Sequence, residues 1–580
     1  MSTRDLAREG RAQRSEPSAK KREDKRGKGQ WAHGYMEPLN QTERMKRDDD
    51  GMNCRVRIEN IYSKKGFRSI DKGDLRGRFK WWGLYTQRKQ GLPGGVTASA
   101  EPEELEDEFF MMRIRIPGGL LTSEQTRVVA EISERYGRDI ADITDRQNIQ
   151  LHWIRIEDVP IIWEKLEAVG LSTTEACGDV PRNILGCPIA GVAADELIDT
   201  SEIIQDIAAT VAVDPQFTNL PRKYKTTVTG CAHQCAQHEV NCLSFVAVDK
   251  DGEVGFDVWI GGGLSSNPHI AQRIGAFVTP DKVAEVWGAV TALYRDYGYR
   301  RVRNRARLKF LMADWGPAKM RQVLQDEFLG YELPDGPAPA PSATATRDHV
   351  GVFDQKDGRK TVGFSARAGR LNGHQLRQVA DLSDEHGSGS VRLTTQQKAV
   401  IVDVAEPDAL VQALEDMGLE VNGSPFRRST MACTGIEFCK LALSETKSRA
   451  QQVYAELTER FPDFTEDIRI HINGCPNSCA RFQVADIGFM GCVAERPDGT
   501  SSDAFLVTLG GGLGDQLAFG RRVRGLRVFG EDLTDYTSVL LERYIHGGGD
   551  AETFSDFVNA MDDERFARFA EPPSGMTRAR

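Results

Sequence analysis

The stretches CTGIEFC (433–439) and NGCPNSCA (473–480), joined by a run of helical character, organise this chain. They place four cysteines in the pattern C-x5-C-x35-C-x3-C. Four thiolates can hold a tetrahedral zinc ion or a 4Fe–4S cluster. The spacing is looser than the usual zinc pairs and differs from both ferredoxin runs, so the cysteines alone leave both kinds of centre open.

The residues around the second pair of cysteines predict a local conformation. Asn473-Gly474 indicates a turn, and Pro476 suits the first position of a helix. Such a helix would bring Cys475 and Cys479 onto one face, near backbone amides that favour a thiolate.

Composition narrows the class of protein. A chain of 580 residues with 40% hydrophobic content predicts several domains with full cores. No window approaches the roughly 18 apolar residues of a membrane span. Eleven cysteines without a secretory signal indicate a reducing compartment, hence the cytoplasm. The net charge of −10 argues against a dedicated nucleic-acid binder.

The first fifty residues are charged and contain few apolar side chains, as in KKREDKRGKGQ (20–30). The segment is too acidic for a transit peptide and has no apolar run for a signal peptide. It is interpreted as a solvated disordered tail, with a basic partner-binding arm as the alternative.

The chain contains an internal repeat. RIRIPGGLLTSEQTRVVAEISERYG (113–137) returns as FSARAGRLNGHQLRQVADLSDEHG (364–387), and 142–171 returns as 391–419. Each copy predicts strand, Gly turn, amphipathic helix, strand and helix, which is a ferredoxin-like half-domain. The two copies could complete one sheet.

The repeat continues beyond these half-domains. TVTGCAHQC (227–235) matches IHINGCPNSC (470–479), and VWIGGGLSS (258–266) matches VTLGGGLGD (507–515). Between the halves, LPDGPAPAPSATATR (333–347) is interpreted as a Pro/Ala linker with no reason to pack. The sequence therefore predicts a tandem duplication about a pseudo-two-fold axis.

From about residue 80 to 545 these motifs resemble the siroheme-containing sulfite and nitrite reductase family. The resemblance implies an α+β fold with two ferredoxin-like half-domains and two larger α/β siroheme/Fe–S domains. It implies siroheme and one 4Fe–4S cluster, which Cys433, Cys439, Cys475 and Cys479 would hold, with Cys479 also the axial ligand of the siroheme iron. The expected segments are a tail (1–50), a wrapping segment (51–105), half-domain 1 (106–175), siroheme domain 1 (176–332), the linker (333–347), half-domain 2 (348–425) and domain 2 with the cluster (426–580).

The resemblance also implies a substrate site. Four positions match the family's anion-binding set, namely Arg113, Arg182, Lys223 and Lys225. Expected siroheme contacts are Arg146, Gln147, Gln150, Asn183 and the backbone amides of Gly510, Gly511 and Gly512. The basic run RRVRNRARLKF (300–310) would face siroheme carboxylates or the electron donor, or else form an exposed amphipathic strand.

Two features of the repeat imitate other sites. Cys231 and Cys235 occupy the places of Cys475 and Cys479, but Arg182-Asn183 falls where Cys439 should be. Buried thiols are therefore expected there, with a second cluster as the alternative. The Gly510–Gly514 run imitates a dinucleotide fingerprint without its full context.

Substrate and donor follow from two further observations. Lysine at both ends of Lys223-Tyr224-Lys225 resembles sulfite reductases, whereas plant-type nitrite reductases carry K-W-N. No flavin-binding region or dinucleotide loop is evident, so the resemblance implies a monomer that takes electrons from reduced ferredoxin. The expected reaction is sulfite to sulfide; the alternatives are nitrite to ammonia and a non-catalytic zinc- or nucleic-acid-binding protein.

Tyr85 and Cys177 match one further feature of similar enzymes. Cys177 stands at the repeat position of Cys433, five residues before Arg182, and Tyr85 lies in WWGLYTQR (81–88). Some similar sulfite reductases carry a tyrosine–cysteine thioether beside siroheme, and this pair is expected to form it. A buried free thiol and a core tyrosine are the alternative.

Overall fold

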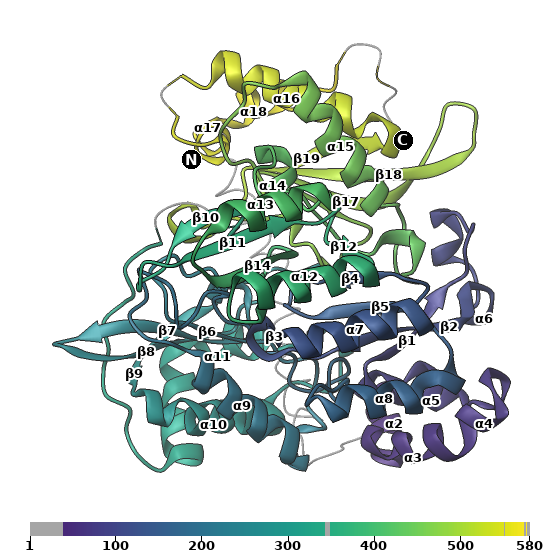
Figure 1. The fold of residues 1–580 in the computed structure, drawn as a ribbon, viewed down its shortest axis with the longest axis vertical. Helices are drawn as coiled ribbons and strands as arrows, with labels where there is room; N and C mark the ends of the chain where they lie inside the picture. Colours follow the sequence, from purple (N-terminus) through teal and green to yellow (C-terminus); the bar gives the residue numbers. More distant parts are fainter. Residues whose placement is uncertain (1–38, 343–347, 550, 574–575, 577–580) are drawn as a thin grey trace, which may run out of the picture.

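The computed structural model describes residues 39–342, 348–549, 551–573 and 576, which form four sheets covered by helices (Figure 1). Two sheets belong to the ferredoxin-like halves and two to the larger domains. The predicted α+β tandem architecture is confirmed.

The first ferredoxin-like sheet has the strand order β1-β2-β5-β4-β12. Its first four strands are β1 (Leu84–Arg88), β2 (Glu106–Ile114), β5 (Ile149–Ile154) and β4 (Ala141–Ile143). They alternate with α7 (Ser123–Tyr136) and α8 (Val159–Ala168), in the predicted strand–turn–helix–strand–helix order. A capping box of Thr122 and Gln125 starts α7.

The second ferredoxin-like sheet has the order β10-β11-β14-β13-β3. Its strands β10 (Gly351–Asp354), β11 (Lys360–Ser365), β14 (Lys398–Val404) and β13 (Ser390–Leu393) accompany α12 (Gly373–His386) and α13 (Pro407–Asp416). The capping box recurs with Asn372 and Gln375, as expected of a true repeat.

The two halves exchange a strand. β12 (Arg370–Leu371) from the second half pairs with β4 of the first, and β3 (Leu120–Thr122) from the first pairs with β13 of the second. The copies therefore build two five-stranded sheets rather than one shared sheet, and α7 and α12 lie side by side (Figure 1). One apolar core runs beneath both sheets.

The larger domains each place parallel strands beside an antiparallel ribbon. The sheet of the first domain consists of β6 (Thr226–Thr229), β7 (Leu243–Lys250), β8 (Glu253–Ile260) and β9 (Gln272–Val278). It packs against α9 (Ser201–Val213), α10 (Val283–Tyr297) and α11 (Leu308–Val323). In the second, β15 (Met431–Ala432), β16 (Ile470–Asn473), β17 (Ile487–Glu495), β18 (Ser501–Leu509) and β19 (Arg521–Phe529) pack against α15 (Lys447–Arg460), α16 (Leu533–Gly547), α17 (Phe554–Asn559) and α18 (Asp563–Phe569).

The charged N-terminal tail ends earlier than predicted. Residues 1–38 lie outside the described part, but Gln41–Asp48 form helix α2. Glu43 and Lys46 on this helix are buried, and Lys46 pairs with Asp179 at 3.5 Å. The prediction was wrong for residues 39–50 because these charges have partners in the first large domain, which a local sequence pattern does not reveal.

Two other segments pack more closely than predicted. In the linker, Leu333 joins the core of the first large domain, and the Ser342 hydroxyl donates to the His233 carbonyl at 2.9 Å; residues 343–347 lie outside the described part. The basic run 300–310 forms a short 3₁₀ turn and the start of α11 rather than an exposed strand. Its Arg300 is buried against Glu43 at 3.1 Å.

The wrapping segment lies against the loop that contains Cys439. The Arg88 amide donates to the Phe438 carbonyl at 2.9 Å, and the Thr97 hydroxyl donates to the Ala442 carbonyl at 2.8 Å. The chain passes so close at Gly94 that an added Cβ would lie 1.7 Å from the Leu443 carbonyl oxygen. Among the residues that the structure describes, no helix is long and apolar enough to cross a membrane.

Candidate functional site

The four predicted cluster cysteines come together at the ends of two parallel strands. Cys433 follows β15, and Cys475 follows the neighbouring β16. The Gly474 amide donates to Cys433 Sγ at 3.2 Å, and the Cys439 amide closes a turn onto the Gly435 carbonyl. Burial, followed by the charge of Cys479, raises the pKa of Cys433 to about 12. Thiols packed this closely become thiolates together only around a cation.

The predicted helix at Pro476 is absent, and residues 474–480 form turns instead. Ser478 has φ 56°, in the left-handed region, and the Ala480 amide donates to Asn473 Oδ1 at 2.7 Å. The left-handed residue breaks the helical course between the two cysteines. Cys475 is buried and Cys479 is exposed, so Cys479 faces outward from the cysteine group.

The Lys223-Tyr224-Lys225 motif runs beside the segment that contains Arg182. Tyr224 bridges Pro181 in parallel, and the Arg182 amide donates to the Tyr224 carbonyl at 2.7 Å. The Tyr224 ring is fully buried against Trp287 and Tyr294. Side chains alternate along an extended segment, so both lysines lie on the side opposite this core.

Both lysines face a positively charged environment. Burial, then Lys225 and Arg307, holds the pKa of Lys223 well below its usual range. Burial, then Arg146, lowers the pKa of Lys225 to about 7. Both lysines also lie within electrostatic range of Cys479.

Arg113 is a further cationic residue within electrostatic range of Cys479. It lies on β2 opposite Gln150 on β5 and donates to the Gln150 Oε1. Its Nη1 donates to Cys177 Sγ at 2.7 Å, and the Tyr85 hydroxyl also bonds Cys177. Arg182 Nη2 donates to the Gly178 carbonyl at 2.9 Å, which fixes the loop that contains Cys177.

Arg146 and Asn183 are joined by two hydrogen bonds. Arg146 Nη2 donates to the Asn183 carbonyl at 2.5 Å, and Asn183 Nδ2 donates to the Arg146 carbonyl at 2.9 Å. Arg146 Nη1 also donates to Asn241 Oδ1 at 3.0 Å. The structure therefore brings these two predicted contacts next to Lys225, whose pKa Arg146 helps to lower.

Gln147 has a different role from the predicted one. Its side chain is fully buried, and Nε2 donates to the carbonyls of Gly118, Gly186 and Leu393 at 2.8–3.2 Å. Its Oε1 accepts the Gly186 amide at 3.1 Å. All its hydrogen bonds go to backbone, so its side chain has no donor left for a cofactor.

Replacing Gln147 by alanine is expected to lower the Tm of the holoenzyme by about 1–2.5 °C, because buried carbonyls lose their donor, at about 1–3 kcal/mol. Differential scanning calorimetry measures this, with the exposed Gln412→Ala as matched control. Siroheme content should stay unchanged. Loss of siroheme at unaltered Tm would instead indicate that Gln147 contacts the cofactor, as the sequence analysis expected.

The glycine run does not offer free amides, which corrects the sequence expectation. The amides of Gly510, Gly511 and Gly512 donate to the carbonyls of Asp486, Ala485 and Ala518 at 2.9–3.0 Å. An added Cβ at Gly511 would lie 2.6 Å from the Gln483 carbonyl oxygen. Close approach of two backbone segments, rather than a bound nucleotide, accounts for this run.

The structure adds three cationic residues to the site that the sequence analysis did not name one by one. Arg481 lines a cavity with Arg146 and Lys225 and donates to the Thr395 carbonyl at 2.5 Å. Arg307 Nη2 donates to Cys242 Sγ at 3.2 Å, and Lys309 Nζ to the Leu264 carbonyl at 2.9 Å. Arg307 and Lys309 belong to the basic run 300–310, for which the sequence analysis expected siroheme carboxylates or the electron donor as one possible partner.

Arg481 marks the pseudo-two-fold axis. Its repeat counterpart is Gln237, and Arg481 Nη1 donates to the Gln237 Oε1 across the axis. Both residues have left-handed backbones, with φ 57° and 60°. Comparing CAQHEV with CARFQV would have singled out this Gln-to-Arg change as a departure from symmetry.

The arginine and cysteine side chains of this site fit the cofactors that the family resemblance implies. Within the described residues, Arg146, Arg307 and Arg481 each keep a buried Nε without a hydrogen-bond partner. Buried guanidinium groups with unused donors indicate an anionic ligand, since unpaired buried charge is strongly unfavourable. Siroheme carries several carboxylates, and the adjacent cysteines supply four thiol ligands.

Comparisons with known proteins agree with this geometry. A family described as the nitrite and sulphite reductase 4Fe–4S domain matches residues 177–330 and 423–576. A second, the nitrite/sulfite reductase ferredoxin-like half domain, matches 103–169 and 353–416. "Sulfite reductase (ferredoxin) 1" of Mycolicibacterium paratuberculosis is 50% identical over 546 residues, covering 93% of this chain and 98% of that protein.

One further relative and one solved structure also match this chain. The assimilatory ferredoxin-dependent nitrite reductase of Haloferax mediterranei is 36% identical, covering 91% of this chain and 93% of that protein. The solved structure of the Mycobacterium tuberculosis NirA protein superposes with a TM-score of 0.90 at 47% identity, covering 93% of this chain and 99% of that one. This chain belongs to the nitrite and sulphite reductase family, whose cofactors are siroheme and a 4Fe–4S cluster.

Proposed function

We propose that this protein reduces sulfite to sulfide with electrons from reduced ferredoxin. The observation that carries the proposal is the pair Lys223 and Lys225, both half-buried and both close enough to Cys479 to interact with it electrostatically, as Arg113 also is. The relatives that share about half of this sequence bear the name of ferredoxin-dependent sulfite reductase.

The cysteine group would hold the cofactors. Cys433, Cys439, Cys475 and Cys479 would bind the 4Fe–4S cluster, and Cys479 would also ligate the siroheme iron. Arg146, Arg307 and Arg481 would pair with siroheme carboxylates through their unused nitrogens. When bound, the two cofactors supply the path for the electrons that reduce the substrate.

The cationic side chains would bind the substrate and deliver protons. Arg113 and Arg182 hold a permanent charge and would orient the small oxyanion. Reduction of sulfite removes three oxygens as water, so each needs protons. Lys225, with a pKa of about 7, can give up a proton and regain it near neutral pH. Burial beside Lys225 and Arg307 lowers the pKa of Lys223 as well.

Steady-state turnover of sulfite and nitrite with reduced ferredoxin tests the proposal. Sulfite should give the higher kcat/KM. A higher kcat/KM for nitrite would instead assign the protein to the nitrite reductases, which are the more distant relatives. A visible spectrum without chlorin-type absorption would refute both reactions.

Partner and location follow from the same proposal. Ferredoxin is acidic and would dock on a local basic face despite the net charge of −10. The enzyme would act as a monomer in the cytoplasm. All eleven cysteines lie in the described residues and none of them forms a disulfide, which suits a reducing compartment.

Tyr85 and Cys177 are expected to form a thioether. Cys177 is fully buried, hydrogen-bonds the Tyr85 hydroxyl and receives a hydrogen bond from Arg113. Bond formation removes two hydrogens and requires an oxidant that takes two electrons. Intact-peptide mass spectrometry of the active enzyme should find the two peptides joined, two hydrogens light and resistant to reductant. Two separate unmodified peptides would refute the cross-link.

A further inference from the structure

Three cysteines outside the proposed redox centre gather around one point. Cys231 Sγ lies 3.5 Å from Cys235 Sγ, and the Cys187 thiol is within hydrogen-bonding reach of both. Each is at most 6% exposed. Buried thiols from distant parts of the chain meet here, although the sequence indicated only the Cys231–Cys235 pair.

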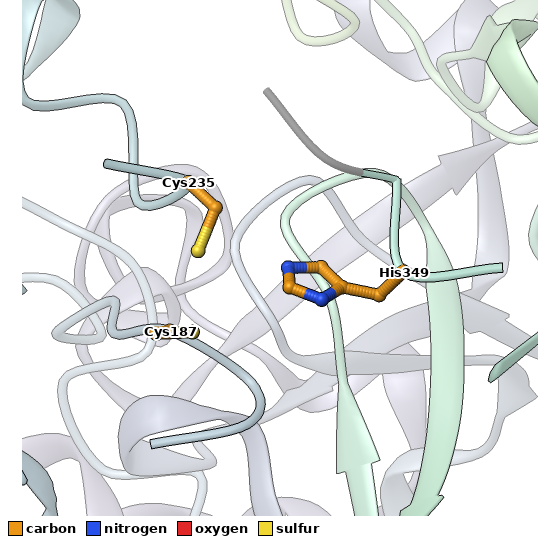
Figure 2. A group of neighbouring side chains, drawn as sticks. All are labelled: Cys187, Cys235 and His349. Atoms are coloured by element: carbon orange, nitrogen blue, oxygen red, sulfur yellow. The ribbon is translucent and has the colours of Figure 1, made fainter. Parts of the chain in front are cut away.

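A histidine from the other half of the molecule lies beside two of these cysteines, Cys187 and Cys235. The ligand atoms of Cys187, Cys235 and His349 all lie within 4.8 Å of one another. Figure 2 shows Cys235 and the His349 ring facing each other from segments of the two halves. His349 is 4% exposed, so this is an interior cluster rather than a surface coincidence.

The position of His349 is fixed by its surroundings. Its backbone has φ 63°, an uncommon conformation for a residue with a side chain. The chain at Gly363 passes so close that an added Cβ would lie 1.5 Å from the His349 carbonyl oxygen. The preceding Asp348 pairs with Arg428 at 2.9 Å. Such constraint often accompanies a functional role.

The spacing fits one ion better than a cluster. Tetrahedral zinc with Zn–S of about 2.3 Å and Zn–N of about 2.0 Å requires ligand atoms about 3.5–3.8 Å apart. In a 4Fe–4S cluster each cysteine binds a separate iron, so its ligand sulfurs stand farther apart than two ligands of one ion. The 3.5 Å between the Sγ atoms of Cys231 and Cys235 is slightly shorter than the roughly 3.8 Å between two sulfurs on one zinc ion, and far closer to it than to the spacing in a cluster.

The surroundings supply what zinc thiolates need. The Ile189 amide bonds Cys187 Sγ and the Cys235 amide bonds Cys231 Sγ, which are the outer hydrogen bonds that orient metal ligands. One dication, three thiolates and a neutral imidazole leave a single net negative charge. Arg392, half-buried near Cys187 and donating to the Ala190 carbonyl at 2.7 Å, offers the compensating charge.

We propose that Cys187, Cys231, Cys235 and His349 form a structural zinc site that joins the two halves of the molecule. Zn²⁺ replaces the three thiol protons, which leave to solvent, and nothing is oxidised or reduced. Cys231 follows β6, and Lys225 precedes it. The site therefore anchors the far end of the strand that positions the Lys223-Tyr224-Lys225 segment. It shares no residue with the four cysteines that would hold the iron centres.

Elemental analysis of the holoenzyme, purified without chelator from zinc-supplemented cells, tests this inference. We expect about one zinc per chain, in addition to the iron of the redox centres. Cys235→Ser and His349→Ala should each remove most of the zinc, leave iron and labile sulfide unchanged and lower the Tm. Cys492→Ser, a free thiol on β17, is the matched control and should retain zinc.

Wild-type measurements keep the test independent of how the variants fold. Zinc absent from wild type, and not taken up from ZnCl₂ with a thiol reductant, would overturn the site. A Cys231–Cys235 disulfide in zinc-free protein, found by mass spectrometry after alkylation, would also overturn it. So would zinc that remains stoichiometric in both Cys235→Ser and His349→Ala. Sulfite turnover is not needed for any of these readouts.

Discussion

Cys479→Ser is expected to yield protein that lacks the 4Fe–4S cluster and has lost the spectral coupling between siroheme and cluster. The physical reason is that one thiolate would serve both centres, and Cys479 is the one cysteine of the four that is exposed toward the cationic group. Iron content, labile sulfide and the visible spectrum measure the loss, and sulfite turnover should vanish with it.

The repeat supplies the control for this experiment. Cys235 occupies the position of Cys479 in the first half, and Cys235→Ser should keep full iron and labile sulfide. Loss of the cluster in Cys235→Ser would show that the first half does bind iron and that its assignment here is wrong. Zinc measured in the same samples separates this question from the inference about Cys187 and His349.

Lys225→Asn is expected to reduce sulfite turnover by about 10- to 100-fold, because one charge-assisted contact of about 1.5–3 kcal/mol and a proton donor are lost together. Nitrite turnover should fall much less, since the change makes the motif more similar to that of nitrite reductases. Steady-state kinetics on both substrates with reduced ferredoxin measure the difference.

A surface lysine serves as the matched control for Lys225. Lys282 is exposed and pairs with Glu285 at 2.8 Å, so Lys282→Asn should leave both turnovers unchanged. Equal losses on sulfite and nitrite in Lys225→Asn would remove this residue from substrate discrimination. It would then serve only to hold the anion or the siroheme.

Several parts of the fold and site were predictable because they depend on local pattern. The alternation in Lys223-Tyr224-Lys225 places both lysines on one side, and the capping residues of α7 and α12 mark the repeat. The four cluster cysteines stand in two short motifs. Their meeting follows from the parallel pairing of β15 and β16.

Other features depend on contacts between distant segments. The Cys475–Cys479 turn departs from a helix because Ser478 adopts a left-handed backbone and Asn473 takes the Ala480 amide. Arg481 belongs to the site because it crosses the axis to Gln237, and Cys187 meets His349 only after the halves pack. No periodicity or motif spacing in one segment carries such information.

The exchanged strands have a consequence for the order of folding. As the chain leaves the ribosome, β4 has an open edge until residues 370–371 arrive, and β3 has no partner until β13 has been made. Each ferredoxin-like unit is therefore incomplete on its own, with an exposed strand edge that invites aggregation. A gene split at the junction between the halves would yield two fragments that must assemble before either is stable. The two copies thus depend on each other for a complete set of strands, whatever connects them.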